Sequence, residues 1–408
     1  MGSEKNLEIE YLRALAVVMV IIGHLPELLP FHKAQFTQIH AFYVPWTGVD
    51  LFFCISGYVV SKSFIEFADT HKAEGNFWLA AQCFWIRRIY RLLPSAWTWL
   101  FIGILCSVFF NHTGVFNNWW QNLRSATAIL TFSGNLANQY NQLLAPNDVY
   151  WSLALEEQFY FLFPLFLLVT AGTWRWRILL VLIALQFMID RNPFGTSFAA
   201  MAWSFRVDPI MWGILIFMFS RARLFSLFEP TFLKHSGLLA LAFNILLIYL
   251  LGAIPSQLIT MPMAHGLVSL IAAIFVFMAS YQSNYVLNIP GLSGILAWLG
   301  SRSYALYLIH MPVCRMTVEG YSRYAERMHY ALDGYFTLPM LLTATLLMIL
   351  LAELNFRLIE NPLRKLGVEL SKKRLDDWRG KSTNPPSEQT EMVRSSGLIS
   401  PMPASNPD

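Results

Sequence analysis

Long apolar stretches separated by short polar segments run along most of this chain. Crossing the hydrocarbon core of a bilayer takes about 20 apolar residues in a helix. Stretches of this kind lie near residues 11–29, 46–63, 93–111, 150–171, 178–190, 198–219, 236–253, 262–280, 295–314 and 336–356, of which 178–190 is short. The pattern predicts an all-α integral membrane protein with about ten transmembrane helices.

The segment between residues 119 and 136 does not fit this alternation. It begins with Trp119 and Trp120, continues as a short apolar run, and is followed by the polar residues 138–148. Counting it as a span would place Arg175 and Arg177 on the outer side. We therefore expect a re-entrant or interfacial helix on the outer face, with its tryptophans at headgroup level.

Basic residues indicate the orientation, because cytoplasmic loops are enriched in Lys and Arg. With the amino terminus inside, the cytoplasmic loops carry Arg87, Arg88, Arg91, Arg175, Arg177, Arg221, Arg223, Lys234, Arg357, Arg364 and Lys365. The outer loops receive little more than Arg191, Arg315, Arg323 and Arg327. Both termini are expected in the cytoplasm. Residues 1–366 form the expected membrane domain, and 367–408, charged and then rich in Ser, Pro and Asn, are expected to be a disordered tail.

Composition supports the membrane assignment and excludes several other classes. The 408 residues are 56% hydrophobic and 13% charged, whereas a soluble domain carries about 25% charge. The net charge of +4 forms no basic stripe, so no nucleic-acid partner is expected. Cys54, Cys83, Cys106 and Cys314 show neither metal-ligand nor disulfide spacing and are expected to pack as small residues. No metal site is predicted. No cleavable signal peptide is predicted either, because the first apolar stretch is long and contains Arg13.

Three arginines mark a candidate binding layer toward the inner side. Arg88 and Arg91 are three residues apart at the mouth of a span, so on a helix they share one face. Arg13, near the start of the first apolar stretch, lies at the same expected depth. Guanidinium groups in this arrangement can clamp a phosphate or pyrophosphate. The alternative is that these are ordinary cytoplasmic arginines reaching lipid headgroups.

Four ionisable residues mark a second layer toward the outer side. His24 follows Arg13 by eleven residues, which puts both on one helix face about 16 Å apart. Asp50, Glu156 and His310 come from three other apolar stretches and reach a similar expected depth. A neutral histidine oriented by a carboxylate can take a proton from a hydroxyl. Each residue taken alone would more often serve to form a hydrogen bond between helices. The similar expected depth of all four favours a catalytic role.

Other charged residues in apolar stretches have less specific interpretations. Arg206 and Asp208 are two apart, so they cannot pair with each other on a helix and each needs a partner elsewhere. Glu353 and Arg357 are four apart and are expected to be a structural pair. His265 has no neighbouring motif and is expected to serve packing.

Taken together, these strings resemble the acyltransferase-3 family of integral membrane acyltransferases along nearly the whole chain to about residue 366. The resemblance is carried by the Arg13–His24 spacing and by residues 48–58, 88–91, 151–160, 206–213, 300–310 and 360–362. It implies transfer of an acyl group, usually acetyl from acetyl-CoA, to a hydroxyl of a surface glycan. It also implies a role for the arginine–histidine pair. With its short final segment, the chain resembles stand-alone members of the family such as O-antigen O-acetyltransferases. This resemblance implies a multi-pass protein of the bacterial inner membrane.

The resulting hypothesis assigns roles to residues. Arg13, Arg88 and Arg91 would bind the donor acetyl-CoA, and His24 would act as general base, with Asp50 or Glu156 orienting it or binding the sugar. Candidate acceptor or cavity residues are Ser56, Tyr58, Trp151, Arg206, Asp208, Tyr304 and His310. No permanently bound cofactor is expected; the partners are acetyl-CoA, the bilayer and a glycan or lipid-linked glycan such as lipopolysaccharide O-antigen or exopolysaccharide. Two alternatives are acylation of a small molecule such as a macrolide, and a non-enzymatic transporter that uses the same charges.

Overall fold

The computed structural model describes residues 6–141, 144, 146–192, 196–257 and 260–383. Within these residues every regular element is helical and no strand forms, which confirms the all-α prediction. The α-helices are α1 (Leu7–Gly23), α2 (Leu25–Leu28), α3 (Lys33–His40), α4 (Gly48–Ala73), α5 (Phe77–Phe109), α6 (Trp119–Leu130), α7 (Gly134–Asn141), α8 (Tyr150–Val169), α9 (Gly172–Met188), α10 (Ser197–Ser204), α11 (Asp208–Ser220), α12 (Gly237–Ala253), α13 (Ala264–Ser280), α14 (Ser293–Ser301), α15 (Ser303–Arg327), α16 (Thr337–Asn355) and α17 (Asn361–Thr383).

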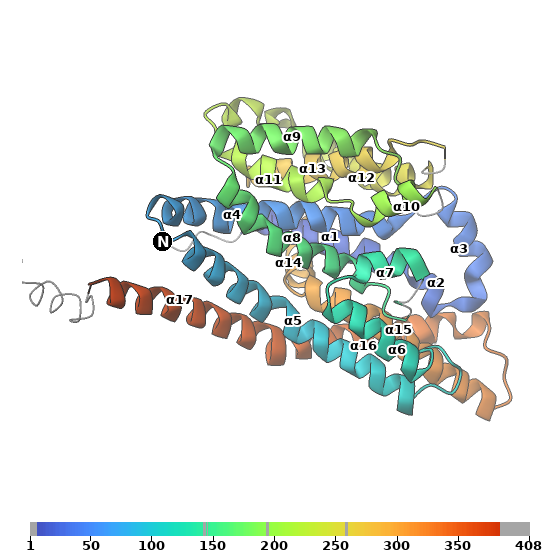
Figure 1. Ribbon diagram of the computed structural model, residues 1–408. Coiled ribbons are helices and arrows are strands. Elements are labelled where there is room, and N and C mark those ends of the chain that lie inside the picture. Colours follow the sequence, from blue (N-terminus) through green and yellow to red (C-terminus); the bar gives the residue numbers. More distant parts are fainter. Residues whose placement is uncertain (1–5, 142–143, 145, 193–195, 258–259, 384–408) are drawn as a thin grey trace, which may run out of the picture.

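The long helices run in roughly one direction and stack in layers (Figure 1). Helices α9 and α11–α13, green to yellow, lie at the top of this view. Helices α1, α4 and α8 occupy the middle, and α5, α15, α16 and α17 lie below them. The middle layer is therefore covered on both sides, and it is the layer that carries most of the candidate site residues.

Close backbone contact holds the middle layer to the upper one. A Cβ atom added at Gly57 of α4 would collide with the Ile210 carbonyl of α11, and one added at Gly213 would collide with the Cys54 carbonyl. Small residues let two helices approach in this way, and such contacts drive helix association where no hydrophobic effect operates. The outer surfaces carry exposed large apolar side chains, for example Leu185 on α9, Ile245 on α12 and Leu346 on α16. Such a surface fits a lipid environment.

Five helical segments among the described residues are long and apolar enough to cross a membrane: Pro45–Ala73, Phe77–Phe109, Tyr150–Val169, Gly237–Gln257 and Gly334–Arg379. Helices α10 and α11 make a sixth if their pair, bent by 42°, counts as one span. Several other predicted spans correspond to shorter helices. Helices α1, α9 and α13 have 17 residues each, about 25 Å of helix, against a hydrocarbon core of about 30 Å. The number ten and the cytoplasmic placement of both termini stay predictions.

Three of the predicted spans are interrupted rather than continuous. The stretch 11–29 breaks after Gly23, ahead of Pro26, which lacks the amide hydrogen that a continuing helix needs. The stretch 198–219 breaks between α10 and α11, where Pro209 stands at the start of α11. The stretch 295–314 breaks at Arg302, between α14 and α15. The Arg302 guanidinium donates a hydrogen bond to the Glu353 carboxylate of α16. His24, Arg206 and Arg302 therefore lie at or next to helix ends, not inside uninterrupted helices.

The expectations for residues 119–136 and for the tail have different outcomes. Residues 119–136 fall in two short helices, α6 and α7. The 12 residues of α6 span only about 18 Å, less than the hydrocarbon core of about 30 Å, and the re-entrant or interfacial placement on the outer face stays a prediction. The expected disorder of 367–408 is wrong for 367–383, because α17 continues to Thr383 and packs along α5. The reason is tertiary contact: Arg87 of α5 donates a hydrogen bond to Ser371 of α17 at 2.8 Å. Residues 384–408 lie outside the described residues.

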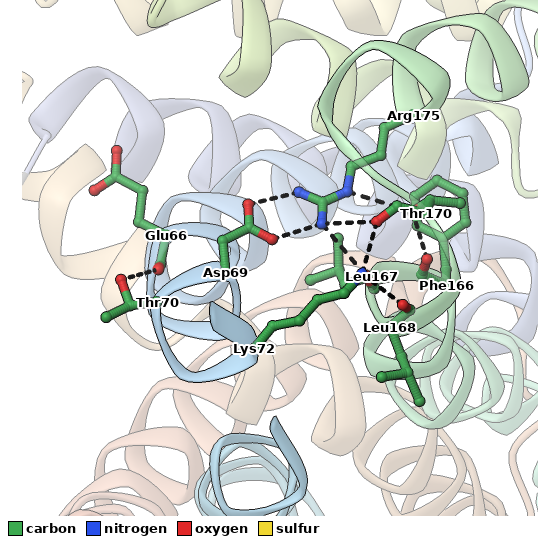
Figure 2. A network of polar contacts seen from close by, with 9 residues as sticks. All are labelled: Glu66, Asp69, Thr70, Lys72, Phe166, Leu167, Leu168, Thr170 and Arg175. Atoms are coloured by element: carbon green, nitrogen blue, oxygen red, sulfur yellow. Dashed lines mark hydrogen bonds and ion pairs between the residues drawn. The ribbon is translucent and has the colours of Figure 1, made fainter. Parts of the chain in front are cut away.

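A polar network joins α4, α8 and α9 at one end of the middle layer (Figure 2). The Lys72 ammonium donates to the carbonyl groups of Leu167, Leu168 and Thr170 at the end of α8. Arg175 of α9 donates to both carboxylate oxygens of Asp69 at 2.7 and 2.6 Å. Cations at a helix carboxyl end satisfy carbonyls that have no partner within the helix, so this network fixes the α8–α9 turn against α4.

Candidate active site

A pocket lies in the middle of the molecule between α1, α4, α5, α8 and α15. Its empty space, including the part open to solvent, is about 770 Å³, within the range of small-molecule sites, which is about 300–1,000 Å³. Six of the predicted site residues line it: Arg13, Ser56, Arg88, Arg91, Glu156 and Tyr304. We call it the central pocket. Helices distant in sequence thus bring the three candidate donor-binding arginines into one site.

The arginines give this pocket a positive side. Arg13 forms an ion pair with Glu10 at 2.9 Å within α1. Arg88 stacks over the rings of Phe84 and Tyr160, with its guanidinium carbon 5.4 and 5.2 Å from the ring centroids. Stacking against aromatic faces orients a guanidinium while leaving its hydrogen atoms free for another ligand.

Glu156 lies on the same pocket and interacts with the arginines, not with a histidine. Its carboxylate interacts electrostatically with Arg88 and Arg91 and is within reach of the Ser56 and Tyr160 hydroxyls. The Ser56 and Tyr160 hydroxyls are themselves 2.6 Å apart. Because α8 places Glu156 beside the arginines, it is not placed to orient His24; its alternative role, binding of the sugar, and its expected depth in the membrane stay predictions.

His24 and His310 form a pair beyond the pocket. Their rings meet edge to face with centroids 5.0 Å apart. The Nδ1 atom of His24 lies 2.9 Å from the Val20 carbonyl, and that of His310 lies 2.7 Å from the Tyr307 carbonyl. Because a carbonyl only accepts, each Nδ1 donates, and the neutral ring then carries its lone pair on Nε2. Backbone carbonyls, not Asp50 or Glu156, orient these two histidines.

The surroundings of the histidine pair are charged. Glu27, Asp148 and Arg315 interact electrostatically with His24, and Arg315 lies 3.9 Å from the Asp148 carboxylate. Asp148 lies in the turn before α8, where partial burial raises the pKa of its carboxyl and the Arg315 guanidinium opposes this shift. Polar groups of both signs next to a basic nitrogen can bind hydroxyl-rich ligands.

Tyr307 borders both the central pocket and the histidine pair. Its side chain lines the pocket, and its ring centroid lies 5.7 Å from that of His310. Its hydroxyl donates to the Val149 carbonyl at 2.9 Å and lies 2.6 Å from the Ser152 hydroxyl. One aromatic ring, whose hydroxyl is held at the start of α8, therefore contacts both the arginine-lined pocket and His310.

Asp50 belongs to a different cluster. It is fully buried, and its Oδ1 atom lies 3.2 Å from His265 Nε2 and 3.9 Å from Arg206 Nε. The assignment of His265 to packing alone is thus wrong, and Asp50 is not placed to orient His24; its other expected role, binding of the sugar, stays a prediction. The reason is helix packing: α13 brings His265 to α4, and the break between α10 and α11 brings Arg206 there. The residues next to Asp50 in the sequence carry no sign of these contacts.

A tryptophan cage surrounds Arg206. Its guanidinium carbon lies 3.8 Å from the Trp203 centroid, 4.0 Å from that of Trp151 and 5.2 Å from that of Trp46. Only 2% of the Arg206 side chain is exposed. Cation–π contacts stabilise a desolvated guanidinium, so Trp151 and Arg206 form a packed support beside the pocket.

The remaining predicted residues also pack in the core. Asp208 accepts hydrogen bonds from Arg191 at 2.5 and 3.1 Å and from Ser269 at 2.5 Å, so Arg206 and Asp208 do find separate partners, as predicted. Tyr58 packs against Phe217 and is 4% exposed. Glu353 pairs with Arg357 as predicted, and also with Arg302. Among the described residues no group of three or more His, Cys, Asp or Glu side chains is placed to hold a metal ion.

A helical membrane protein with this site belongs to a recognisable class. Residues 6–354 match the acyltransferase domain that defines the acyltransferase-3 family, and the chain therefore belongs to this family. The resemblance seen in the sequence motifs is confirmed.

Three curated relatives show what the chain is similar to. It is 28% identical over 389 residues to the peptidoglycan O-acetyltransferase OatA of Listeria monocytogenes, covering 88% of this chain and 56% of the relative. It is 27% identical to the putative peptidoglycan O-acetyltransferase YrhL of Bacillus subtilis, covering 87% and 54%. It is 25% identical to a putative O-acetyltransferase of Staphylococcus aureus, covering 88% and 57%. The chain thus spans about half the length of these relatives, and no solved structure matches it.

Proposed function

We propose that this chain is a membrane O-acetyltransferase that moves an acetyl group from cytoplasmic acetyl-CoA to a hydroxyl of a cell-surface glycan. The observation that carries the proposal is the order of groups through the molecule. Arg13, Arg88 and Arg91 line one side of the central pocket, and His24 and His310 lie beyond it with basic Nε2 atoms. This order suits a phosphate-bearing thioester at one end and a hydroxyl at the other.

In this mechanism the arginines bind the donor. Its phosphates contact Arg88 and Arg91 through charge-assisted hydrogen bonds, and its pantetheine arm follows the central pocket toward Tyr307. Glu156, held between the arginines and the Ser56 and Tyr160 hydroxyls, limits how much positive charge the empty pocket carries. Tyr307 lies where the acyl end arrives.

The histidine pair then performs the transfer. His24 Nε2 takes the proton from the acceptor hydroxyl while its oxygen attacks the thioester carbonyl carbon. The new C–O bond forms, the C–S bond breaks, and the departing thiolate receives the proton from the His24 imidazolium. His310, whose ring touches that of His24, supports the same proton transfer.

The acceptor is proposed from the relatives and from the polar surroundings of the pair. Two relatives carry peptidoglycan in their names, so a sugar hydroxyl of peptidoglycan is the first acceptor to test. Lipopolysaccharide O-antigen and exopolysaccharide are further members of the same acceptor class. The proposed location is the bacterial inner membrane, with the histidine pair toward the outer side.

The test uses purified protein, labelled acetyl-CoA and a panel of acceptors: peptidoglycan fragments, O-antigen fragments and a macrolide. We expect His24→Ala to lower product formation by at least a hundredfold, since general acid–base catalysis contributes about 10²–10⁴. His71→Ala is the matched control, because His71 makes the same hydrogen bond to a carbonyl one turn earlier, at Phe67, but lies in the last turn of α4.

The outcomes separate the parts of the proposal. Full activity in His24→Ala would remove this residue from the mechanism. Transfer to the macrolide alone would replace the glycan acceptor by a small molecule. Absence of transfer to every acceptor by a well-folded protein would contradict the enzymatic proposal itself.

A further inference from the structure

A second pocket opens beside the first, between α4, α5 and α17. Arg87, Arg88, Arg91 and Arg364 line it together with Phe64, Phe67, Phe84, Ser63 and Val368. Its empty space, including the part open to solvent, is about 620 Å³. Arg88 and Arg91 line the central pocket as well. This second site, here called the arginine pocket, is therefore adjacent to the first and shares two of its arginines.

The arginine pocket has positive charge without a lining carboxylate among the described residues. The hydrogen bonds that its guanidinium groups make go to neutral groups: Arg87 to the Ser371 hydroxyl, Arg88 to the Ser63 hydroxyl at 3.4 Å, and Arg364 to the Asn361 amide oxygen at 3.1 Å. Two carboxylates lie near this group of arginines: Glu156 interacts electrostatically with Arg88 and Arg91, and Glu360 interacts with Arg91 and Arg364. Four guanidinium groups line the pocket and only two carboxylates lie near them, so positive charge is in excess, which favours binding of an anion with several charges.

Aromatic rings form the other part of this pocket. Phe64 and Phe84 stack with ring centroids 4.3 Å apart, and the Arg87 guanidinium carbon lies 5.9 Å from the Phe67 centroid. Phe67 is partly exposed. Phe64 and Phe84 are buried, so Phe67 is the ring that offers a surface. A site that combines guanidinium groups with such a ring suits a nucleotide, because phosphates bind the guanidinium groups and a base can stack on the ring.

Helix α17 places Arg364 at this site, although the matched family region ends at residue 354. A Cβ atom added at Gly367 would lie 2.6 Å from the Tyr90 Cβ atom, so α17 and α5 touch directly one turn after Arg364. The bond from Arg87 to Ser371 holds the next turn. Arg364 therefore has a defined position on the wall of the pocket.

We propose that the arginine pocket binds the nucleotide end of the coenzyme A donor, and that Arg364 contacts its 3′-phosphate. Arg88 and Arg91, shared by both pockets, then hold the pyrophosphate, and the pantetheine arm enters the central pocket. This inference rests on the proposed function for the identity of the donor. The same phosphate chemistry is offered by an anionic lipid headgroup, and the experiment separates these two sources.

The experiment measures binding to purified protein in neutral detergent for three molecules: coenzyme A, dephospho-coenzyme A, which lacks the 3′-phosphate, and pantetheine. We expect Arg364→Ala to weaken coenzyme A ten- to a hundredfold, the effect of losing one charge-assisted bond, and to leave dephospho-coenzyme A and pantetheine unchanged. Arg364→Lys should recover part of the loss. Lys365→Ala is the matched control, because Lys365 is the exposed neighbour that does not line the pocket.

Three results would overturn the inference. Equal weakening of all three molecules would mean that the substitution only disturbs the docking of α17. Unchanged coenzyme A affinity would remove Arg364 from the site. Coenzyme A affinity unchanged by Arg364→Ala, with a loss of affinity for an anionic phospholipid added to the same detergent solution, would assign the pocket to a headgroup. Because binding is measured without turnover, a protein that binds coenzyme A through Arg364 but acetylates no acceptor would refute the proposed function and leave this inference standing.

Discussion

At the scale of single residues, this protein keeps several charged side chains inside an apolar core by placing more than one partner around each of them. Arg206 has a carboxylate at 3.9 Å and three tryptophan faces around it. Arg191 and Asp208 are each 2% exposed and share two hydrogen bonds. An unpaired charge at this depth would cost several kcal/mol. We infer that these clusters hold the helices around the pocket in one arrangement.

The network in Figure 2 allows a prediction for one such residue. Asp69→Ala removes the carboxylate from Arg175, whose side chain is only 4% exposed. We expect a loss of about 1.5–3 kcal/mol in the free energy of unfolding, because a nearly buried guanidinium loses two charge-assisted bonds. The midpoint of thermal denaturation in detergent should fall measurably.

The control for this prediction lies one turn away on α4. Glu66 pairs with Arg221, but both side chains are more than 60% exposed, and such surface pairs contribute about 0–1 kcal/mol. Glu66→Ala should therefore leave the midpoint nearly unchanged. Equal shifts for the two variants would contradict a special role for the Asp69–Arg175 pair.

Sequence patterns predicted some of the site residues and misplaced others, for reasons visible at this scale. Arg88 and Arg91 face one pocket because residues three apart share a helix face, and the structure shows them there. His265 of α13 contacts Asp50 of α4, which lies 215 positions earlier in the chain. Such a contact depends on how helices pack, so no local spacing predicts it. Tyr307 was missed as a pocket residue because it reads as one more aromatic in an apolar run.

At the scale of elements, the helix breaks matter as much as the helices. Hydropathy predicted the apolar stretches but not the breaks at His24, at Arg206 and at Arg302. Proline explains the first two, since it cannot donate the backbone hydrogen bond. The tail shows the opposite error: residues 367–383 are polar enough to suggest disorder, but they form a helix because α5 offers a matching surface.

The contact between α17 and α5 makes a prediction about this element. Gly367→Ala places a methyl group 2.6 Å from the Tyr90 Cβ atom, so α17 must shift. Overpacking of this kind costs about 1–3 kcal/mol. We expect faster proteolysis within α17 and weaker coenzyme A binding, because Arg364 moves with the helix.

Gly320→Ala is the control for this substitution. Gly320 lies inside α15 with no atom near the added Cβ position, and alanine is the better helix former by about 1 kcal/mol. This variant should be neutral or more stable. If Gly367→Ala leaves both proteolysis and coenzyme A affinity unchanged, α17 does not support the arginine pocket.

At the scale of the whole molecule, the mechanism requires that the arginine pocket and the histidine pair face opposite sides of the membrane. Glu74, exposed at the end of α4, lies on the side of the Lys72 network. Asp148, after α6 and α7, interacts electrostatically with His24. The proposed path for the acetyl group therefore runs from the side of Glu74 to the side of Asp148, provided that α6 and α7 together do not cross.

Single cysteines test this arrangement in a background where Cys54, Cys83, Cys106 and Cys314 are replaced. We expect Glu74→Cys to react with an impermeant maleimide only from the cytoplasm, and Asp148→Cys, whose native side chain is 41% exposed, only from the outer face. Lys365→Cys should react from the cytoplasm, like Glu74→Cys. If Asp148→Cys reacts from the cytoplasm instead, residues 119–136 cross the membrane, the histidine pair lies on the same side as the donor, and transfer across the bilayer is excluded as the route.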